Sequence, residues 1–304
     1  MGIAGVSMSG LQKILETLGD QISGCDIKSD QYPTHSAEHI NKDLDGVIIS
    51  AAVGEAATKE LNQAKELKVP VITRAKMINR LMQQKKGIAV AGMHGKTTLS
   101  SMITKILKEA GMAPSFLIGG QIPGLGNAQW DKGEYFVVEA CEYARQFLDL
   151  RPKIAVVTNI EEEHLDTYKG GLPEIKKAFI KFVKLLPKNG LLVLCQDDPK
   201  VMALKRYAKC KVKTYSVKKP WPGLQLKIPG RFNLQNATAA ARVCHEIGVS
   251  HQVIKKALND FIGVKRRFEI KGWGIKKLHV TYSLQAKSCT LFIASTTRRP
   301  LYSF

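Results

Sequence analysis

Residues 88–98 read Ile88-Ala89-Val90-Ala91-Gly92-Met93-His94-Gly95-Lys96-Thr97-Thr98. A short apolar run ends here in a glycine-flanked turn, and a Lys-Thr-Thr sequence follows the turn. The apolar residues after it have the spacing of a helix with one buried face: Leu99, Met102, Ile103, Ile106, Leu107 and Ala110. These features together predict a strand, a phosphate-binding loop and a helix.

The residue types in this turn suit a phosphate. Glycines let backbone N–H groups close around phosphate oxygens, and a helix N-terminus adds partial positive charge. Lys96 can reach the outer phosphates, and the hydroxyl of Thr97 is placed to ligate Mg²⁺. The spacing departs from the common form G-x-x-x-x-G-K-S/T, because Val90 stands at the first glycine position. A glycine turn used only for packing is the alternative interpretation.

Composition excludes several classes of protein. The 304 residues give room for two domains, and no window approaches 18 uninterrupted apolar residues, which argues against membrane insertion. The N-terminus lacks a secretory signal, and six scattered cysteines without a CxxC pair argue against zinc and against disulfides, as expected in the cytoplasm. The net charge of +20 is spread along the chain without a nucleic-acid-binding motif, so we expect no nucleic-acid partner.

Strands and helices alternate along the chain, which predicts an α/β fold with a mainly parallel sheet. The first 80 or so residues read as a Rossmann-like unit, although only Met1 precedes the opening glycine turn, so the first strand is nearly absent. The elements predicted after this turn are a helix over 11–18, a short strand near Ile22, a strand over 46–50, a helix over 57–67, a strand over 69–72 and a helix through 77–81.

The second unit begins near Gly87. A strand over 136–138 delivers Glu139, and a strand over 154–157 leads to Thr158 and, further on, His164. Ligands of open α/β sheets bind at such strand ends. By position, Glu139 is either a Mg²⁺ ligand or a helix cap, and His164 is either a metal ligand or a solvated side chain. Further predicted elements are a helix over 174–186, a strand over 191–194, a strand near 212, and helices around 237–243 and 254–261.

Several motifs in order resemble the Mur ligases, the ATP-dependent amide-forming enzymes of peptidoglycan synthesis. They are Gly92–Thr98, Glu139-Ala140-Cys141-Glu142-Tyr143 with Phe147-Leu148, Thr158-Asn159-Ile160-Glu161 with His164-Leu165-Asp166-Thr167-Tyr168, Pro229–Ala237, Phe261–Glu269, the opening turn with Met8-Ser9-Gly10, and Thr73-Arg74-Ala75. The resemblance covers residues 2 to about 271. It implies a UDP-sugar-binding Rossmann-like domain over 1–84 and a P-loop ATPase-type central domain over 85–271.

The resemblance also implies a reaction and its residues. UDP-N-acetylmuramate and L-alanine would be the substrates, joined through an acyl phosphate, with ATP and Mg²⁺ as cofactors. The family's ATP loop corresponds to Gly92, Met93, His94, Gly95, Lys96, Thr97 and Thr98. By the same analogy Lys96, Glu139 and His164 are catalytic, Thr97, Glu139 and His164 hold Mg²⁺, Asn233 or Asn236 meets the adenine, and Arg267 meets the phosphates.

The end of the chain departs from the family. In place of a third domain, residues 272–304 form a basic tail without a single Asp or Glu. We interpret this tail as a truncated or frame-shifted ending, with a diverged basic tail as the alternative. Three functions stay open on these observations: the alanine-adding ligase, a non-catalytic ATP-binding fragment of such a ligase, and a sister ligase that recycles murein peptide. The sequence leaves the oligomeric state undetermined.

Overall fold

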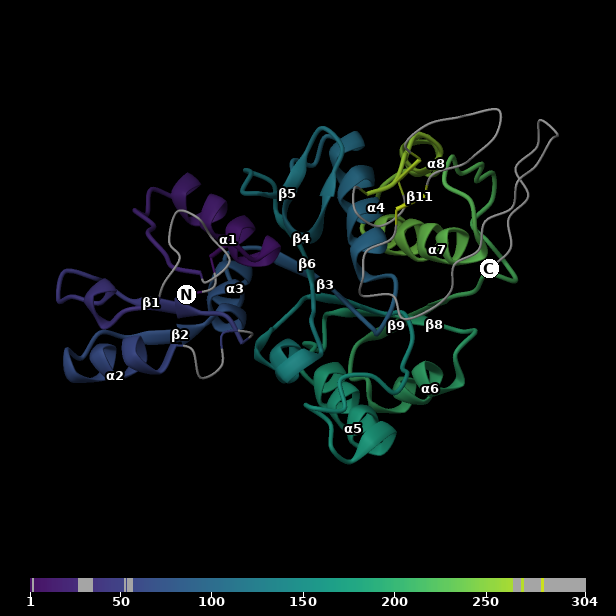
Figure 1. Cartoon of the computed structure of the whole chain (residues 1–304). Helices are drawn as coiled ribbons and strands as arrows, with labels where there is room; N and C mark the ends of the chain where they lie inside the picture. Colours follow the sequence, from purple (N-terminus) through teal and green to yellow (C-terminus); the bar gives the residue numbers. More distant parts are fainter. Residues whose placement is uncertain are drawn as a thin grey trace.

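The computed structural model describes residues 1, 3–26, 35–51, 53, 57–264, 269–270 and 280–281. A two-stranded parallel sheet lies near the N-terminus, and a seven-stranded sheet forms the centre of the molecule (Figure 1). The short strands β10 (Glu269–Ile270) and β11 (Val280–Thr281) form a separate antiparallel pair. The predicted α/β fold with a mainly parallel sheet is confirmed, whereas the predictions for Arg267 and for the rest of the 272–304 tail fall outside the described residues.

The N-terminal unit alternates helices and short strands. Its elements are α1 (Val6–Thr17), the 3₁₀ turn η1 (Ala37–His39), β1 (Val47–Ile49), α2 (Thr58–Glu66), β2 (Val71–Thr73) and α3 (Arg74–Met82). β1 and β2 pair in parallel with Val47 opposite Val71. The helices predicted over 11–18, 57–67 and 77–81 are confirmed, as are the two strands between them.

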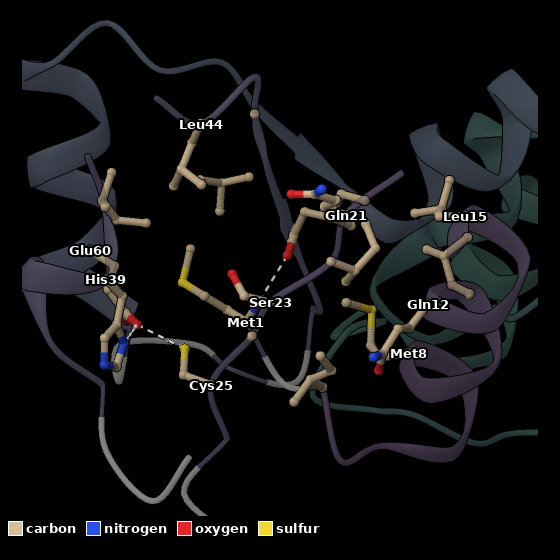
Figure 2. A pocket seen from close by; sticks show the side chains of 18 residues that line it. Met1, Met8, Gln12, Leu15, Gln21, Ser23, Cys25, His39, Leu44 and Glu60 are labelled. Atoms are coloured by element: carbon tan, nitrogen blue, oxygen red, sulfur yellow. Dashed lines mark hydrogen bonds and ion pairs between the residues drawn. The ribbon is translucent and has the colours of Figure 1, made fainter. Parts of the chain in front are cut away.

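The strand predicted near Ile22 is wrong, because residues 21–26 run without regular strand pairing. The physical reason is the short stretch that lies beside them. Ile3 N donates to Cys25 O at 3.3 Å, and on the other side the Met1 amine donates to Ile48 O at 3.0 Å. Met1 and Ile3 therefore bridge the two segments over too short a length for a continuous ladder. A cavity of about 250 Å³ lies between them, lined by Ile22, Cys25, Val47 and others (Figure 2).

The central sheet comprises β3 (Lys86–Ala91), β4 (Ser115–Ile122), β5 (Gly126–Gln129), β6 (Tyr135–Glu139), β7 (Ile154–Val157), β8 (Leu191–Cys195) and β9 (Lys211–Tyr215). The order across the sheet is β5-β4-β6-β3-β7-β8-β9, and only β4 and β5 pair antiparallel. β3 is buried along Gly87–Ala91 because strands lie on both sides of it and helices cover both faces. Its nearly continuous apolar sequence is typical of such a central parallel strand.

Helices cover the two faces of this sheet (Figure 1). One face carries α4 (Lys96–Glu109), α7 (Arg231–Glu246) and α8 (His251–Asn259), and the other carries α5 (Gly171–Lys184) and α6 (Pro199–Met202), with the 3₁₀ segments η3 (Tyr143–Asp149) and η4 (Ala203–Tyr207) in the loops. Ala237, Ala240 and Ala241 are fully buried, and these small side chains let α7 lie close to α4. The predicted helices and strands of this unit are confirmed.

The two units contact each other through α1 and α3. α1 packs on the β4–β5 hairpin, where a Cβ on Gly10 would come within 2.6 Å of Leu117 Cδ1. Asn127 Nδ2 donates to Val6 O at 2.8 Å, and Arg74 Nη2 on α3 donates to Gln146 Oε1 at 2.6 Å. The carboxyl ends of β3, β6 and β7 are neighbours in the sheet, so the loops that follow them meet at one edge.

Candidate nucleotide and metal site

The loop between β3 and α4 has a backbone that only glycine adopts without strain at two positions. Gly92 has φ +127° and Gly95 has φ +82°. A Cβ at Gly92 would lie 2.0 Å from Thr158 Oγ1, and one at Gly95 would lie 2.7 Å from Asn236 Oδ1. The two glycines are therefore required both by conformation and by space.

The loop is held in place from the end of β7. Met93 N donates to Asn159 O at 3.3 Å, and His94 N donates to Asn159 Oδ1 at 2.9 Å. Thr158 Oγ1 donates to His94 O at 2.7 Å. The loop that precedes α4 is thus pre-organised by two residues of the neighbouring strand end.

The predicted metal ligands Thr97 and Glu139 lie in direct contact. Thr97 Oγ1 donates to Glu139 Oε2 at 3.1 Å, and Gly119 N donates to Glu139 Oε1 at 2.6 Å. Ligand bonds of about 2.0–2.1 Å in an octahedral Mg²⁺ site place neighbouring oxygens roughly 3 Å apart. The hydroxyl and carboxylate therefore fit two adjacent positions around Mg²⁺. The metal-ligand interpretation of Glu139 stays a prediction.

Lys96 curls back over the loop toward a buried carboxylate. Its Nζ lies 2.5 Å from Gly92 O, 3.1 Å from Met93 O and 2.9 Å from Glu142 Oε1. The side chain of Glu142 is only 1% exposed. A cation in this position can neutralise phosphate oxygens bound at the loop.

His164 meets the same carboxylate from the β7 side. Its Nε2 lies 3.2 Å from Glu142 Oε1, and this hydrogen bond raises the pKa of His164 against the lowering effect of burial. Burial alone would raise the pKa of Glu142, but the bond with His164 and the charge of Lys96 outweigh it and lower that pKa. The other oxygen, Glu142 Oε2, has no hydrogen-bond partner within the described part of the chain. A hydrogen-bond donor of a ligand, or a cation, would satisfy this buried acceptor.

The backbone around this cluster is strained. Ala144 and Arg145 follow Glu142 with φ +48° and φ +56°, and His164 has φ +55°. Residues other than glycine adopt this left-handed region at a cost, and such strain gathers at functional sites. Tyr168 fixes the same loop, because its hydroxyl donates to Glu142 O at 2.7 Å.

Known protein families match both units of the chain. The Mur ligase middle domain matches residues 90–222, and a family model described as "Mur ligase family, catalytic domain" matches residues 1–86. A UDP-N-acetylmuramate--L-alanine ligase of Pelobacter propionicus is 39% identical over 310 residues, which cover 90% of this chain and 67% of that protein. The chain belongs to the Mur ligase family. It spans about two thirds of the length of the curated relatives that it matches.

Solved Mur ligase structures share the fold. The Thermotoga maritima UDP-N-acetylmuramate-alanine ligase aligns with a TM-score of 0.79 and 25% identity, covering 92% of this chain and 72% of that chain. A UDP-N-acetylmuramate:L-alanyl-gamma-D-glutamyl-meso-diaminopimelate ligase from Neisseria meningitidis aligns with a TM-score of 0.78 and 27% identity, covering 87% and 98%. The expected Rossmann-like and central Mur ligase architecture is confirmed.

Not every residue predicted from the Mur ligase resemblance lies at the loop. Asn236 packs against Gly95, whereas the side chain of Asn233 donates to Pro229 O at 2.5 Å within its own turn. Of the two predicted alternatives, Asn236 is the one whose side chain lies beside Gly95. His94 is exposed and lies 3.3 Å from Glu161 Oε2. Thr98 follows Thr97 in the first turn of α4.

Two functional positions of this Mur ligase site have no role that the sequence alone predicts. Glu142 stands in the sequence only as part of a motif, yet in the structure it joins Lys96 to His164. Asn159 stands at a strand end, and it anchors the loop through its side chain and backbone. Glu142 comes three residues after β6 and Asn159 two residues after β7, and this position near a strand end is the signal that points to them. Among the described residues, no helix is long and apolar enough to cross a membrane.

Proposed function

We propose that this chain binds ATP and UDP-N-acetylmuramate and takes part in joining L-alanine to the sugar carboxylate. The observation that carries the proposal is the contact of Thr97 with Glu139 beside a loop whose lysine meets Glu142. Relatives 36–40% identical over about nine tenths of the chain bear the name UDP-N-acetylmuramate--L-alanine ligase. The whole reaction is therefore the function that the site supports best.

The reaction needs two anions to approach each other. Bound ATP supplies a phosphoryl group that turns the sugar carboxylate into an acyl phosphate, and Mg²⁺ offsets the phosphate charge. The amine of L-alanine then forms the amide bond as phosphate leaves. Both steps bring negative charge together, so positive charge held in a fixed place lowers the barrier.

The residues of the chain supply that charge and its placement. Lys96 would exchange its contacts with Gly92 O and Met93 O for phosphate oxygens, while Glu142 keeps its amine over the loop. Thr97 and Glu139 would hold Mg²⁺ through adjacent oxygens. His164 would act beside them, with Glu142 fixing its ring through Nε2. His164 would hold a second metal through Nδ1 while Nε2 stays on Glu142, or through Nε2 if that nitrogen left Glu142.

One alternative substrate has an observation in its favour. The structure of the Neisseria meningitidis tripeptide ligase matches this chain about as well as the alanine ligase structure does, with TM-scores of 0.78 and 0.79. The named relatives at 36–40% identity favour L-alanine. A nucleotide-binding role without ligation is the other alternative.

Phosphate release separates these functions. The purified chain is mixed with ATP, Mg²⁺ and UDP-N-acetylmuramate, and L-alanine or L-alanyl-γ-D-glutamyl-meso-diaminopimelate is added. Release that requires L-alanine supports the proposal, and release that requires the tripeptide supports the sister ligase. Binding of ATP without release under either condition supports the nucleotide-binding role alone.

A matched pair of variants controls this assay. Lys96→Met removes the loop amine, and Lys105→Met removes a partly exposed amine from the same helix, where it pairs with Glu109 at 3.7 Å. We expect the first variant to lose turnover and the second to keep it.

Cytoplasmic localisation is part of the proposal, supported by the free thiols of the five described cysteines.

A further inference from the structure

A second cluster of potential metal ligands lies in the N-terminal unit, on elements separate from the nucleotide loop. Cys25 lies in the segment after α1. His35 lies two residues before η1, and His39 is the last residue of η1. Glu60 lies in the first turn of α2. Figure 2 shows Cys25, His39 and Glu60 gathered at one end of the 250 Å³ cavity. Three distinct segments thus bring sulfur, nitrogen and oxygen donors together.

Several donor atoms of the cluster lie close to one another. Glu60 Oε1 lies 2.9 Å from Cys25 Sγ and 3.4 Å from His39 Nδ1. His35 Nδ1 lies 3.3 Å from Cys25 Sγ and 2.9 Å from Glu60 Oε2. The donor atoms of Cys25, His39 and Glu60 all lie within 4.8 Å of one another.

These separations lie on either side of those in a tetrahedral site. Zinc bonds of about 2.0–2.3 Å place neighbouring ligand atoms roughly 3.3–3.6 Å apart. Rotation of the side chains would have to bring Cys25 Sγ and His39 Nδ1, which lie within 4.8 Å of each other, to this spacing. A cavity along the three residues leaves a path for the ion.

Burial gives the cluster a reason to hold a cation. Glu60 is fully buried, and the ion pairs of its carboxylate within the described chain are with His35 and His39, not with lysine or arginine. A buried carboxylate needs compensating charge or strong hydrogen bonds. A neutral imidazole supplies no charge, whereas a divalent cation supplies charge to all of the donors at once.

We propose that Cys25, His35, His39 and Glu60 form a zinc-binding site in the N-terminal unit. One thiolate, two imidazoles and one carboxylate suit zinc, because a soft sulfur donor disfavours Mg²⁺ and Ca²⁺. The site fixes the segment after α1 to η1 and α2, and the contacts of Cys25, His35 and His39 with Glu60 are made by side chains. It is structural rather than catalytic, since four protein ligands leave no open coordination position.

Cobalt is the probe for this site. Tetrahedral Co²⁺ bound by a thiolate absorbs in the near-ultraviolet by charge transfer, so the band reports on a cysteine ligand. The full chain is titrated with Co²⁺ in excess Mg²⁺, which occupies the oxygen ligands of the nucleotide site. We expect a saturable band at one equivalent that Zn²⁺ abolishes, and a rise in the thermal unfolding temperature with Zn²⁺ that EDTA reverses.

Variants assign the ligands. Cys25→Ser should abolish the band, and His39→Asn should weaken Zn²⁺ binding at least tenfold, whereas Cys210→Ser, with its sulfur elsewhere in the fold, should change neither. His39 is 40% exposed, so its replacement leaves folding intact even where Cys25→Ser does not. The proposal is overturned by absence of the band, by its loss in Cys141→Ser or Cys289→Ser instead of Cys25→Ser, or by undiminished Zn²⁺ affinity in His39→Asn. Each of these readouts is independent of ligase activity.

Discussion

Lys96 Nζ and Glu142 Oε1 lie 2.9 Å apart, with the lysine 14% exposed and the carboxylate 1% exposed. A carboxylate buried to this degree is costly unless its partner stays charged. The pair therefore links the stability of the unbound chain to the residue that we propose meets the phosphates. Removal of either partner affects both properties.

A double-mutant cycle measures that link. Lys96→Met leaves the charge of Glu142 with His164 alone, so we expect a loss of about 3 kcal/mol in the free energy of unfolding. Adding Glu142→Gln removes the uncompensated charge and should restore part of that loss, giving a coupling energy of at least about 1 kcal/mol. Urea unfolding of the wild type, the two single variants and the double variant gives the value. Strictly additive effects of the two substitutions would show that the coupling energy between Lys96 and Glu142 is zero.

Glycine at position 95 is predicted to be essential for nucleotide binding. Gly95→Ala forces a left-handed residue and drives its Cβ to 2.7 Å from Asn236 Oδ1. Gly111→Ala is the matched control, because Gly111 has φ +70° but nothing within 4 Å of the added Cβ. We expect both variants to lose about 1 kcal/mol of stability from backbone strain. Only Gly95→Ala should weaken ATP binding, by tenfold or more in a calorimetric titration, and equal ATP affinities in the two variants would contradict this.

The magnesium requirement should depend on the hydroxyl of Thr97. Thr97→Val removes the oxygen that donates to Glu139 Oε2, so the Mg²⁺ concentration for half-maximal ATP binding should rise about tenfold, a loss of about 1.4 kcal/mol. Thr97→Ser keeps the oxygen and should restore the wild-type value. Thr104→Val is the control on the same helix, because its hydroxyl is buried without a hydrogen-bond partner in the described chain. An unchanged Mg²⁺ requirement in Thr97→Val would remove Thr97 from the metal site.

The sequence is most informative where local pattern and tertiary position agree. The β3 strand, its glycine turn and the α4 helix form one continuous segment, so local pattern alone locates the loop and Lys96. Glu139 can be placed beside Thr97 because parallel strands end at one edge. The resemblance to Mur ligases extends this interpretation to the whole of the central unit.

Elements that depend on distant partners are predicted less well. The β4–β5 hairpin contains Gly119, Gly120, Pro123 and Gly124, which interrupt the strand pattern, and its stability comes from β6 and from α1. The segment near Ile22 has a strand-like pattern but lacks a long enough neighbour. The Cys25, His35, His39 and Glu60 cluster has no short spacing motif, because the fold assembles it from three segments. The scattered cysteines therefore give no sign of it.

Asp131 makes the stability of the central unit sensitive to acid. Lys108 Nζ donates to Asp131 Oδ2 at 2.8 Å, and this hydrogen bond lowers the pKa of Asp131 against the opposing effect of burial. A carboxyl whose pKa is lower in the folded than in the unfolded chain stabilises the fold above its unfolded pKa and loses that contribution as pH falls through the folded pKa.

We therefore expect Asp131→Asn to lower the free energy of unfolding by about 1 kcal/mol at pH 7, a modest value because both side chains are partly exposed. The difference from the wild type should shrink as the pH falls below the ordinary range of aspartate and vanish once the native carboxyl is protonated. Urea unfolding of the wild type and Asp131→Asn across this acid range measures the difference directly. Glu134→Gln is the control, because its pair with Lys86 lies at 2.9 Å but is 50% and 68% exposed, and it should change stability little at any pH. A difference for Asp131→Asn that stays constant through the acid range would mean that the Lys108 contact does not depend on the charge of the carboxylate.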